Sequence, residues 1–120
     1  MIARLFLLAS LTCAALAAAD APPGNENGKK LFAACAVCHD TGKTNKQGPG
    51  LAGIVGRRAG TAPGFRYSGA IRRSGLVWTP ENLDAYLANP QQKVPGNIMP
   101  YAGVADARGR SDLIAYLQSL

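Results

Sequence analysis

The chain has 120 residues, which leaves room for a single domain of modest size. Its 13 Lys and Arg outnumber its 7 Asp and Glu, giving a net charge of +6, but the basic residues are scattered along the chain. Such a balance can steer a protein toward acidic partners or a membrane surface, or can be ordinary solvated charge; without a basic run it does not predict binding to nucleic acid.

The first 19 residues have the pattern of a secretory signal. Their only charged side chain is Arg4, an apolar run extends from Leu5 to Leu16, and three alanines precede Asp20. This pattern predicts cleavage near Asp20, export to the periplasm and a mature domain of residues 20–120. The run is short for a membrane span and has no polar face, which makes an uncleaved anchor or a buried helix the weaker alternatives. Cys13 lies inside the leader and would be removed with it.

A first helix is expected to begin between Asn25 and Asn27. It would carry Leu31, Phe32 and Cys35 on one side. Gly28 lies one turn before Phe32, where a glycine weakens a helix. We interpret it as a position that another backbone approaches closely.

Two further helices are predicted from their ends and their apolar spacing. In "TPENLDAYLANP", Thr79 suits the N-cap, Pro80 suits the first helical position and Pro90 ends the helix. The last helix should run from about Asp106 to the end of the chain, with apolar residues at helical spacing. No stretch shows sustained alternation, so the sequence predicts a small all-α domain.

Two long segments show no helical periodicity. Residues 40–62 contain six of the fourteen glycines, and "QQKVPGNIMPYAG" is bracketed by Pro95 and Pro100. Both are expected to be loops. Long irregular loops are uncommon in a compact domain unless they are functional, and these would need something large and apolar to pack against.

The segment "CAVCHD", residues 35–40, allows three chemistries. A thioredoxin-like redox pair normally opens a helix after a strand, whereas this pair ends a predicted helix and no parallel sheet is expected. A structural zinc site usually has four ligands, but the mature chain supplies two cysteines and one histidine, so a carboxylate would have to be the fourth. The third is the C-x-x-C-H signature of c-type haem attachment, which best fits an exported chain whose loops lack a core.

Elimination suggests the axial ligands of such a haem. The residue after the second cysteine, His39, would be carried under the iron, and it is the only histidine. Met99 is the only methionine after the leader. A lone methionine often just fills a core, but this one lies in a proline-bracketed loop. Lys93 or an open site are the alternatives for the sixth position.

Most of the mature chain resembles the class I cytochromes c, both the bacterial cytochrome c2 type and the mitochondrial type. The resemblance covers about residues 24–120 and implies a small cytochrome c fold, with a few helices and long loops wrapped around one covalently bound haem. It rests on these segments in this order: "GKKLFAACAVCH", "GPGLAGIVGRRAGTAPGFRYSGA", "GLVWTPENLDAYLANP", "VPGNIMPYAG" and "RSDLIAYLQSL".

The resemblance implies a role for each residue of the haem attachment. Cys35 and Cys38 would be the thioether anchors, and His39 and Met99 would ligate the iron from opposite faces. The Pro49 carbonyl would accept the other imidazole N–H of His39 and fix its tautomer.

It also implies roles for the surrounding side chains. Arg57, Tyr67 and Trp78 would hold a buried propionate, and Tyr86 would lie near the methionine sulfur; for the aromatic residues, plain core packing is compatible with these roles. The first and last helices would cross at Gly28, Phe32, Leu113 and Tyr116.

The implied function is that of a one-electron carrier rather than an enzyme, holding one haem c that cycles between Fe(III) and Fe(II). Its expected partners are redox proteins that dock transiently at the haem edge: a reductase or dehydrogenase as donor, and an oxidase, reductase or reaction centre as acceptor. We expect a monomer without stable membrane insertion or nucleic-acid binding. Two rival functions are a haem peroxidase or gas sensor with a labile Met99, and a thiol–disulfide oxidoreductase using Cys35 and Cys38.

Some positions depart from the family pattern. Gln91, Gln92 and Ile98 are uncharged where mitochondrial relatives carry lysines, so the usual docking charge is not expected in full. Ile71 replaces an asparagine that relatives bury beside a water, which predicts a drier pocket. Asn97 stands where threonine is common, and the sequence leaves its contact with a propionate open.

Overall fold

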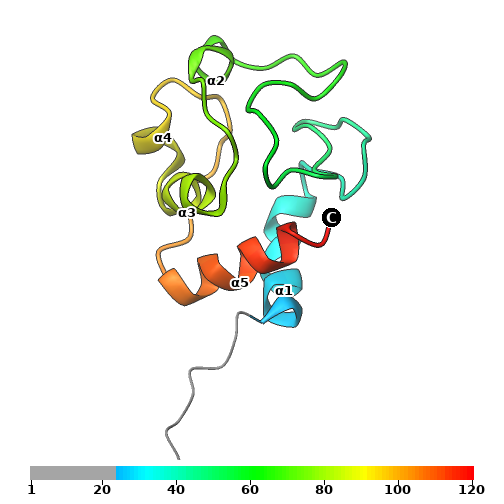
Figure 1. Cartoon of the computed structure of the whole chain (residues 1–120), viewed down its shortest axis with the longest axis vertical. Coiled ribbons are helices and arrows are strands. Elements are labelled where there is room, and N and C mark those ends of the chain that lie inside the picture. The colour runs from blue at the N-terminus through cyan, green and yellow to red at the C-terminus, as the bar shows by residue number, and fades with distance from the viewer. Residues whose placement is uncertain (1–23) are drawn as a thin grey trace, which may run out of the picture.

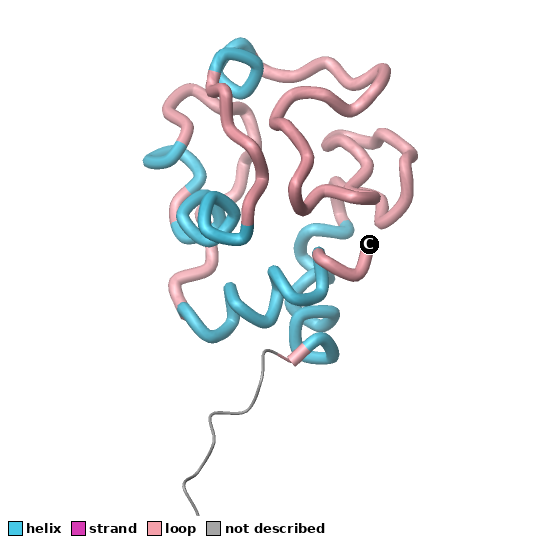
Figure 2. The backbone as a smooth tube through the Cα atoms, in the orientation of Figure 1, coloured by secondary structure: helices cyan, strands magenta, loops and turns pink. Residues whose placement is uncertain are grey.

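The computed structural model describes residues 24–120, so the proposed leader lies outside the described part. These residues form five helices, joined by long loops without strands (Figure 2): α1 (Asn25–Ala36), α2 (Gly69–Arg73), α3 (Pro80–Ala88), α4 (Pro90–Lys93) and α5 (Ala107–Leu117). One isolated β-bridge joins Arg58 to Val77. The predicted all-α domain with long loops is confirmed. None of the described helices has the length and apolar character needed to cross a membrane.

The helices and the long loops occupy different parts of the molecule. In Figure 1, α1 and α5 cross at the lower end, α3, α4 and α2 follow one side, and the loop between α1 and α2 forms the other side. The buried apolar side chains form one cluster, to which α1, α3 and α5 contribute Phe32, Leu83 and Leu113.

Polar N-caps start four of the five helices. Thr79 Oγ1 accepts the N–H of Asn82 at 3.2 Å, as the sequence predicts for the start of α3. Asn89 and Pro90 repeat this arrangement at the start of α4, where Asn89 Oδ1 accepts the backbone N–H of Gln92 at 3.1 Å. The expectation that residues 91–103 are entirely loop is therefore wrong at 91–93, because Pro90 both ends α3 and opens α4.

The crossing of α1 and α5 depends on the missing side chain of Gly28. A Cβ there would overlap the backbone carbonyl of Asp112 and lie 2.9 Å from Cβ of Tyr116. Phe32 and Tyr116 pack their rings with centroids 5.2 Å apart, and Leu113 is fully buried beside them. The predicted crossing is confirmed at all four positions.

Asp112 joins the start of α1 to α5. Its carboxylate accepts the Gly24 N–H and the Asn27 amide, each at 2.6 Å, and lies 3.5 Å from the guanidinium of Arg108. The two hydrogen bonds, that of Asn27 first, lower the pKa of Asp112; burial opposes them, and Arg108 adds a smaller effect in the same direction. The bond from Gly24 satisfies a backbone N–H at the uncapped start of α1.

Replacing Asp112 by asparagine should lower stability at neutral pH and flatten its dependence on acid. A lowered folded-state pKa means that the carboxylate stabilises the fold above the usual carboxyl pKa of about 4, and that this contribution is lost as the pH falls through the lowered value. Guanidinium unfolding midpoints between about pH 3 and 7 should therefore fall less steeply for Asp112→Asn than for the wild type. Glu81→Gln, which removes an exposed carboxylate, should keep the wild-type slope; equal slopes for all three proteins would contradict the assignment.

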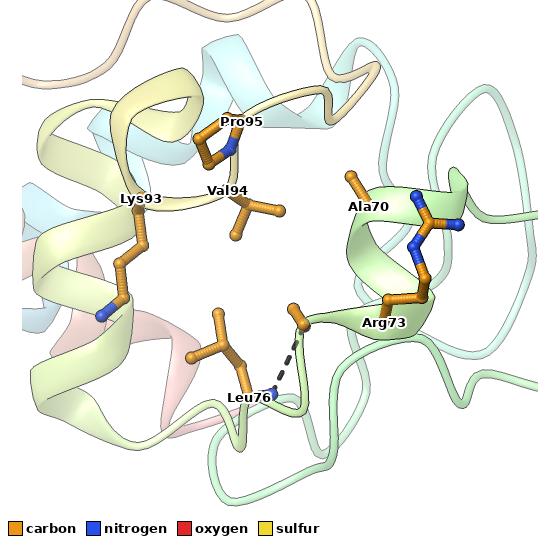
Figure 3. A pocket seen from close by; sticks show the side chains of 7 residues that line it. Ala70, Arg73, Leu76, Lys93, Val94 and Pro95 are labelled. Atoms are coloured by element: carbon orange, nitrogen blue, oxygen red, sulfur yellow. Dashed lines mark hydrogen bonds between the residues drawn. The ribbon is translucent and has the colours of Figure 1, made fainter.

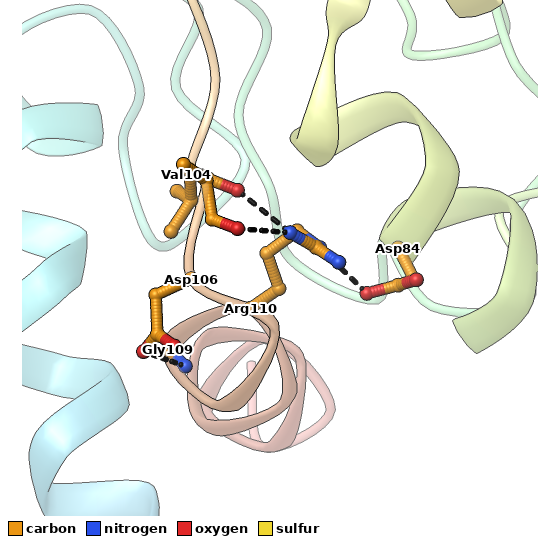
Figure 4. A network of polar contacts seen from close by, with 6 residues as sticks. Asp84, Val104, Asp106, Gly109 and Arg110 are labelled. Atoms are coloured by element: carbon orange, nitrogen blue, oxygen red, sulfur yellow. Dashed lines mark hydrogen bonds and ion pairs between the residues drawn. The ribbon is translucent and has the colours of Figure 1, made fainter.

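A second polar network fixes the segment that precedes α5. Arg110 places Nε 2.8 Å from the carboxylate of Asp84 on α3, and its Nη1 donates to the carbonyls of Val104 at 2.9 Å and Ala105 at 3.0 Å (Figure 4). The Val104 N–H donates to the carbonyl of Leu87 at 2.7 Å. The C-terminal end of the segment between α4 and α5 is thus attached to α3.

Candidate functional site

A cavity of about 400 Å³ lies between the helices and the long loops. This volume is within the range of ligand and cofactor sites. Its lining includes every site residue that the sequence predicts: Cys35, Cys38, His39, Pro49, Arg57, Tyr67, Trp78, Tyr86 and Met99. Residues more than 60 positions apart in the chain therefore meet at one place.

The C-terminal turn of α1 brings both thiols and the imidazole to this cavity. The carbonyl of Cys35 accepts the N–H of Cys38 at 3.0 Å and the N–H of His39 at 2.9 Å. Both cysteines are free thiols. Burial, and to a smaller extent the neighbouring Cys38, raises the pKa of Cys35. The turn thus brings the two thiols and the imidazole to the lining of one cavity.

His39 is held in one orientation by the loop that follows it. Its Nδ1 lies 2.8 Å from the Pro49 carbonyl, and a Cβ on Gly48 would overlap its ring. The Pro49 bond assigns the proton to Nδ1, which leaves Nε2 for a metal ion. Burial lowers the pKa of His39; the Pro49 bond opposes this, and the charge of Lys46 adds to it. A neutral imidazole is the form that ligates iron.

Met99 brings a thioether to the same cavity from the segment after α4. The Tyr86 hydroxyl donates to its sulfur at 3.9 Å. Burial raises the pKa of Tyr86 to about 12, so the phenol keeps its proton at neutral pH. The structure thus places Tyr86 beside the methionine sulfur, as the family resemblance implies.

Arg57, Tyr67 and Trp78 line the cavity and also hold its loops together. The Arg57 guanidinium donates to the carbonyls of Ala52 at 3.1 Å and Gly50 at 3.2 Å, and its backbone carbonyl accepts the Trp78 N–H at 2.8 Å. Further guanidinium N–H groups are left for an acidic ligand group. Trp78 packs against Tyr86, with ring centroids 4.8 Å apart.

The Tyr67 hydroxyl accepts the N–H of Ala62 at 3.0 Å and keeps its own hydrogen for another acceptor. Its ring also packs against Phe65 at 4.8 Å, a cavity residue that the sequence did not single out. Gly48 behind His39 was missed in the same way; its place beside Pro49 in "QGPG" was the only signal.

Much of the remaining lining is apolar. It includes Leu51, Ile54, Ile71, Leu83, Leu87 and Leu113. Ile71, from which the sequence predicts a drier pocket, is buried against the cavity. A flat, largely apolar cofactor with acidic groups at one edge fits such a lining, whereas a polar substrate would lose its hydrogen bonds there.

Two alternatives from the sequence do not agree with the geometry. Among residues 24–120, no three His, Cys, Asp or Glu side chains come together as a metal site would require, which argues against zinc. Lys93, the alternative sixth ligand, lines a different and more open cavity between α2 and the end of α4, together with Ala70, Arg73 and Val94 (Figure 3).

Comparison with known proteins identifies the family of the chain. Residues 25–120 match the family model "Cytochrome c". The chain is 50% identical over 104 residues to cytochrome c2 of Rhodopila globiformis, covering 84% of this chain and 98% of that protein. It is 45% identical over 116 residues to cytochrome c2 of Blastochloris viridis, covering 95% and 87%.

Among solved structures, cytochrome cH from Methylobacterium extorquens superposes with a TM-score of 0.78 at 41% identity, covering 81% of this chain and 99% of that one. The chain therefore belongs to the cytochrome c family and is an electron carrier with one covalently attached haem c.

Proposed function

We propose that Cys35 and Cys38 form the thioether bonds to the haem and that His39 and Met99 are its axial ligands. The observation that carries this proposal is one cavity lined by two free thiols, an imidazole with Nε2 available and a thioether. The haem supplies the redox chemistry, in which the iron cycles between Fe(III) and Fe(II).

The chain's own residues set the conditions of that cycle. The soft sulfur of Met99 favours Fe(II), and a Met/His pair raises the reduction potential. The apolar lining disfavours the additional positive charge of Fe(III). Arg57, Tyr67 and Trp78 would hold the buried propionate through donors that remain after their loop contacts. With both axial positions filled by the protein, no substrate binds, and the chain is a carrier rather than an enzyme.

Electron exchange takes place at the mouth of the cavity. Only three large hydrophobic side chains are exposed among the described residues, and two of them, Val37 (72% exposed) and Ile98 (71% exposed), line this cavity. Gln47, also in the lining, and Gln91, bonded to the residue before Ile98, are uncharged. We assign this rim as the surface where partner proteins dock transiently, a donor reductase or dehydrogenase in turn with an acceptor oxidase, reductase or reaction centre.

The leader of residues 1–19 supports export of residues 20–120 to the periplasm, where the domain works as a monomer. Transient docking at this rim needs little buried area, because a carrier must leave as readily as it arrives.

A charge added to the rim should change the reaction with a small anionic oxidant. Ile98→Lys should speed the oxidation of the reduced protein by ferricyanide roughly 3-fold or more at low ionic strength, because the added cation attracts the anion to the point of electron exit. The gain should disappear at high salt. Ala107→Lys adds the same charge at an exposed position outside the cavity lining and serves as the matched control. Equal stopped-flow oxidation rates for the two variants would show that electrons do not leave through this rim.

The absorption spectrum of protein exported from a host with haem-maturation machinery tests the ligation itself. We expect sharp low-spin bands in the reduced form, the weak red-edge sulfur–iron band in the oxidised form, and no change in the reduced spectrum with carbon monoxide. Ready binding of carbon monoxide would favour the sensor or enzyme function, with Met99 as a labile ligand. A protein without haem would instead favour the thiol–disulfide oxidoreductase function of Cys35 and Cys38.

A further inference from the structure

The segment that carries Met99 has a single buried side chain, and that side chain is polar. Among residues 95–102, Asn97 alone is buried, with 5% of its surface exposed, whereas Ile98 and Pro100 on either side of Met99 are exposed. Apart from the partial packing of Met99 against the core, apolar burial does little to fix this segment. The polar contacts of Asn97 are the main further hold on the backbone of this segment.

Asn97 uses both amide hydrogens and its amide oxygen within the chain. Its Nδ2 donates to the carbonyls of Pro90 and Val94, each at 2.9 Å. Its Oδ1 accepts the backbone N–H of Met99 at 3.0 Å. An amide NH₂ has no third hydrogen, so Asn97 cannot also donate to a propionate without losing one of these bonds.

The carbonyls that Asn97 binds belong to the first residue of α4 and to the residue that follows the helix, and both residues are buried. Pro90 is among the largest fully buried side chains, and Val94 is 4% exposed. Asn97 thus connects a fixed point of the core directly to the backbone of Met99. A polar side chain in such a place is costly to bury unless all its hydrogen bonds are made.

Gln91 completes the connection from the solvent side. Its Nε2 donates to the backbone carbonyl of Asn97 at 2.8 Å. The next residue, Gln92, is also an exposed glutamine of α4, but its part in the structure is a backbone N–H donated to the cap at Asn89. Two identical neighbours therefore differ in a single contact with the ligand segment.

We propose that Asn97, supported by Gln91, is the positioning residue that keeps the Met99 sulfur at the haem iron. The inference rests on the ligation proposed above. In this chain the side-chain amides of Asn97 and Gln91 act on Met99 through backbone hydrogen bonds. Binding of the propionate would fall to Arg57, Tyr67 and Trp78.

The test compares Gln91→Glu with Gln92→Glu in the oxidised holoprotein. Both variants keep the side-chain shape and add one negative charge on the same short helix, but only Gln91→Glu removes a donor to Asn97. Imidazole, added as an external ligand, replaces the methionine at the iron and abolishes the sulfur–iron band. We expect Gln91→Glu to bind imidazole about 5-fold more tightly than wild type, the factor for one lost hydrogen bond. Gln92→Glu should stay within about 2-fold.

Asn97→Asp removes both donors and keeps the acceptor for Met99, so its imidazole affinity should rise by about 10-fold or more. If this variant does not fold, the comparison of Gln91→Glu with Gln92→Glu still tests the inference. Equal imidazole affinities for the two glutamate variants would overturn the inference. So would a lower guanidinium unfolding midpoint for Gln91→Glu without a change in imidazole affinity, because the contact would then only stabilise the fold. A wild-type protein without the sulfur–iron band would instead overturn the ligation itself, and this inference with it.

Discussion

Replacing Gly28 by alanine should destabilise the holoprotein by about 3 kcal/mol or more. The added Cβ overlaps the backbone carbonyl of Asp112, and a backbone atom cannot move aside as a side-chain tip can. The two helices would have to separate, and the ring contact of Phe32 with Tyr116 would weaken. Guanidinium unfolding followed by circular dichroism measures the loss.

The sign of this effect separates helix packing from helix propensity. Alanine is a better helix former than glycine by about 1 kcal/mol, so an unpacked Gly28 would make the variant more stable. Ala33→Gly, at an exposed position of α1, serves as the control and should cost about 1 kcal/mol from propensity alone. A Gly28→Ala variant at least as stable as the wild type would contradict the close crossing of α1 and α5.

Replacing Met99 by alanine should open the iron to external ligands. The reduced protein should then bind carbon monoxide, the sulfur–iron band should be absent from the oxidised spectrum, and the reduction potential should fall by on the order of 0.1 V or more. The reason is that the soft thioether stabilises Fe(II) relative to Fe(III). Spectra under carbon monoxide and a redox titration measure the three effects.

Ile98→Ala provides the control, because Ile98 is the neighbouring residue in the same cavity lining but offers no ligand atom. It should keep the sulfur–iron band and exclude carbon monoxide. If Met99→Ala still excluded carbon monoxide, another side chain would have to ligate the iron, and the assignment of Met99 would be wrong.

The sequence was sufficient where a short local pattern has one physical meaning. Thr79 followed by Pro80 predicted the start of α3, and "CAVCH" predicted that two thiols and an imidazole meet at the end of α1. The signal for α4 was equally local, since Asn89 and Pro90 repeat the cap and first position of α3. It was missed because Pro90 was interpreted only as the end of the preceding helix.

Other features depend on the path of the chain in space and were beyond local patterns. Ser68 caps the short helix α2 through Ile71, but five residues carry too little periodicity to predict a helix. The amide contacts of Asn97 arise because the loop after α4 folds back over Pro90 and Val94. The spacing of residues along the sequence does not predict that the loop folds back in this way.

The bond from Gly24 to Asp112 also has a consequence for the order of events during biogenesis. It joins residues 88 positions apart, so the first helix lacks this bond until the last helix has emerged. A contact between residues so far apart contributes only after the cost of closing the intervening loop has been met. The cysteine pair at the end of α1 should therefore remain accessible on an incompletely folded chain, which is the state in which an attachment enzyme could reach both sulfur atoms.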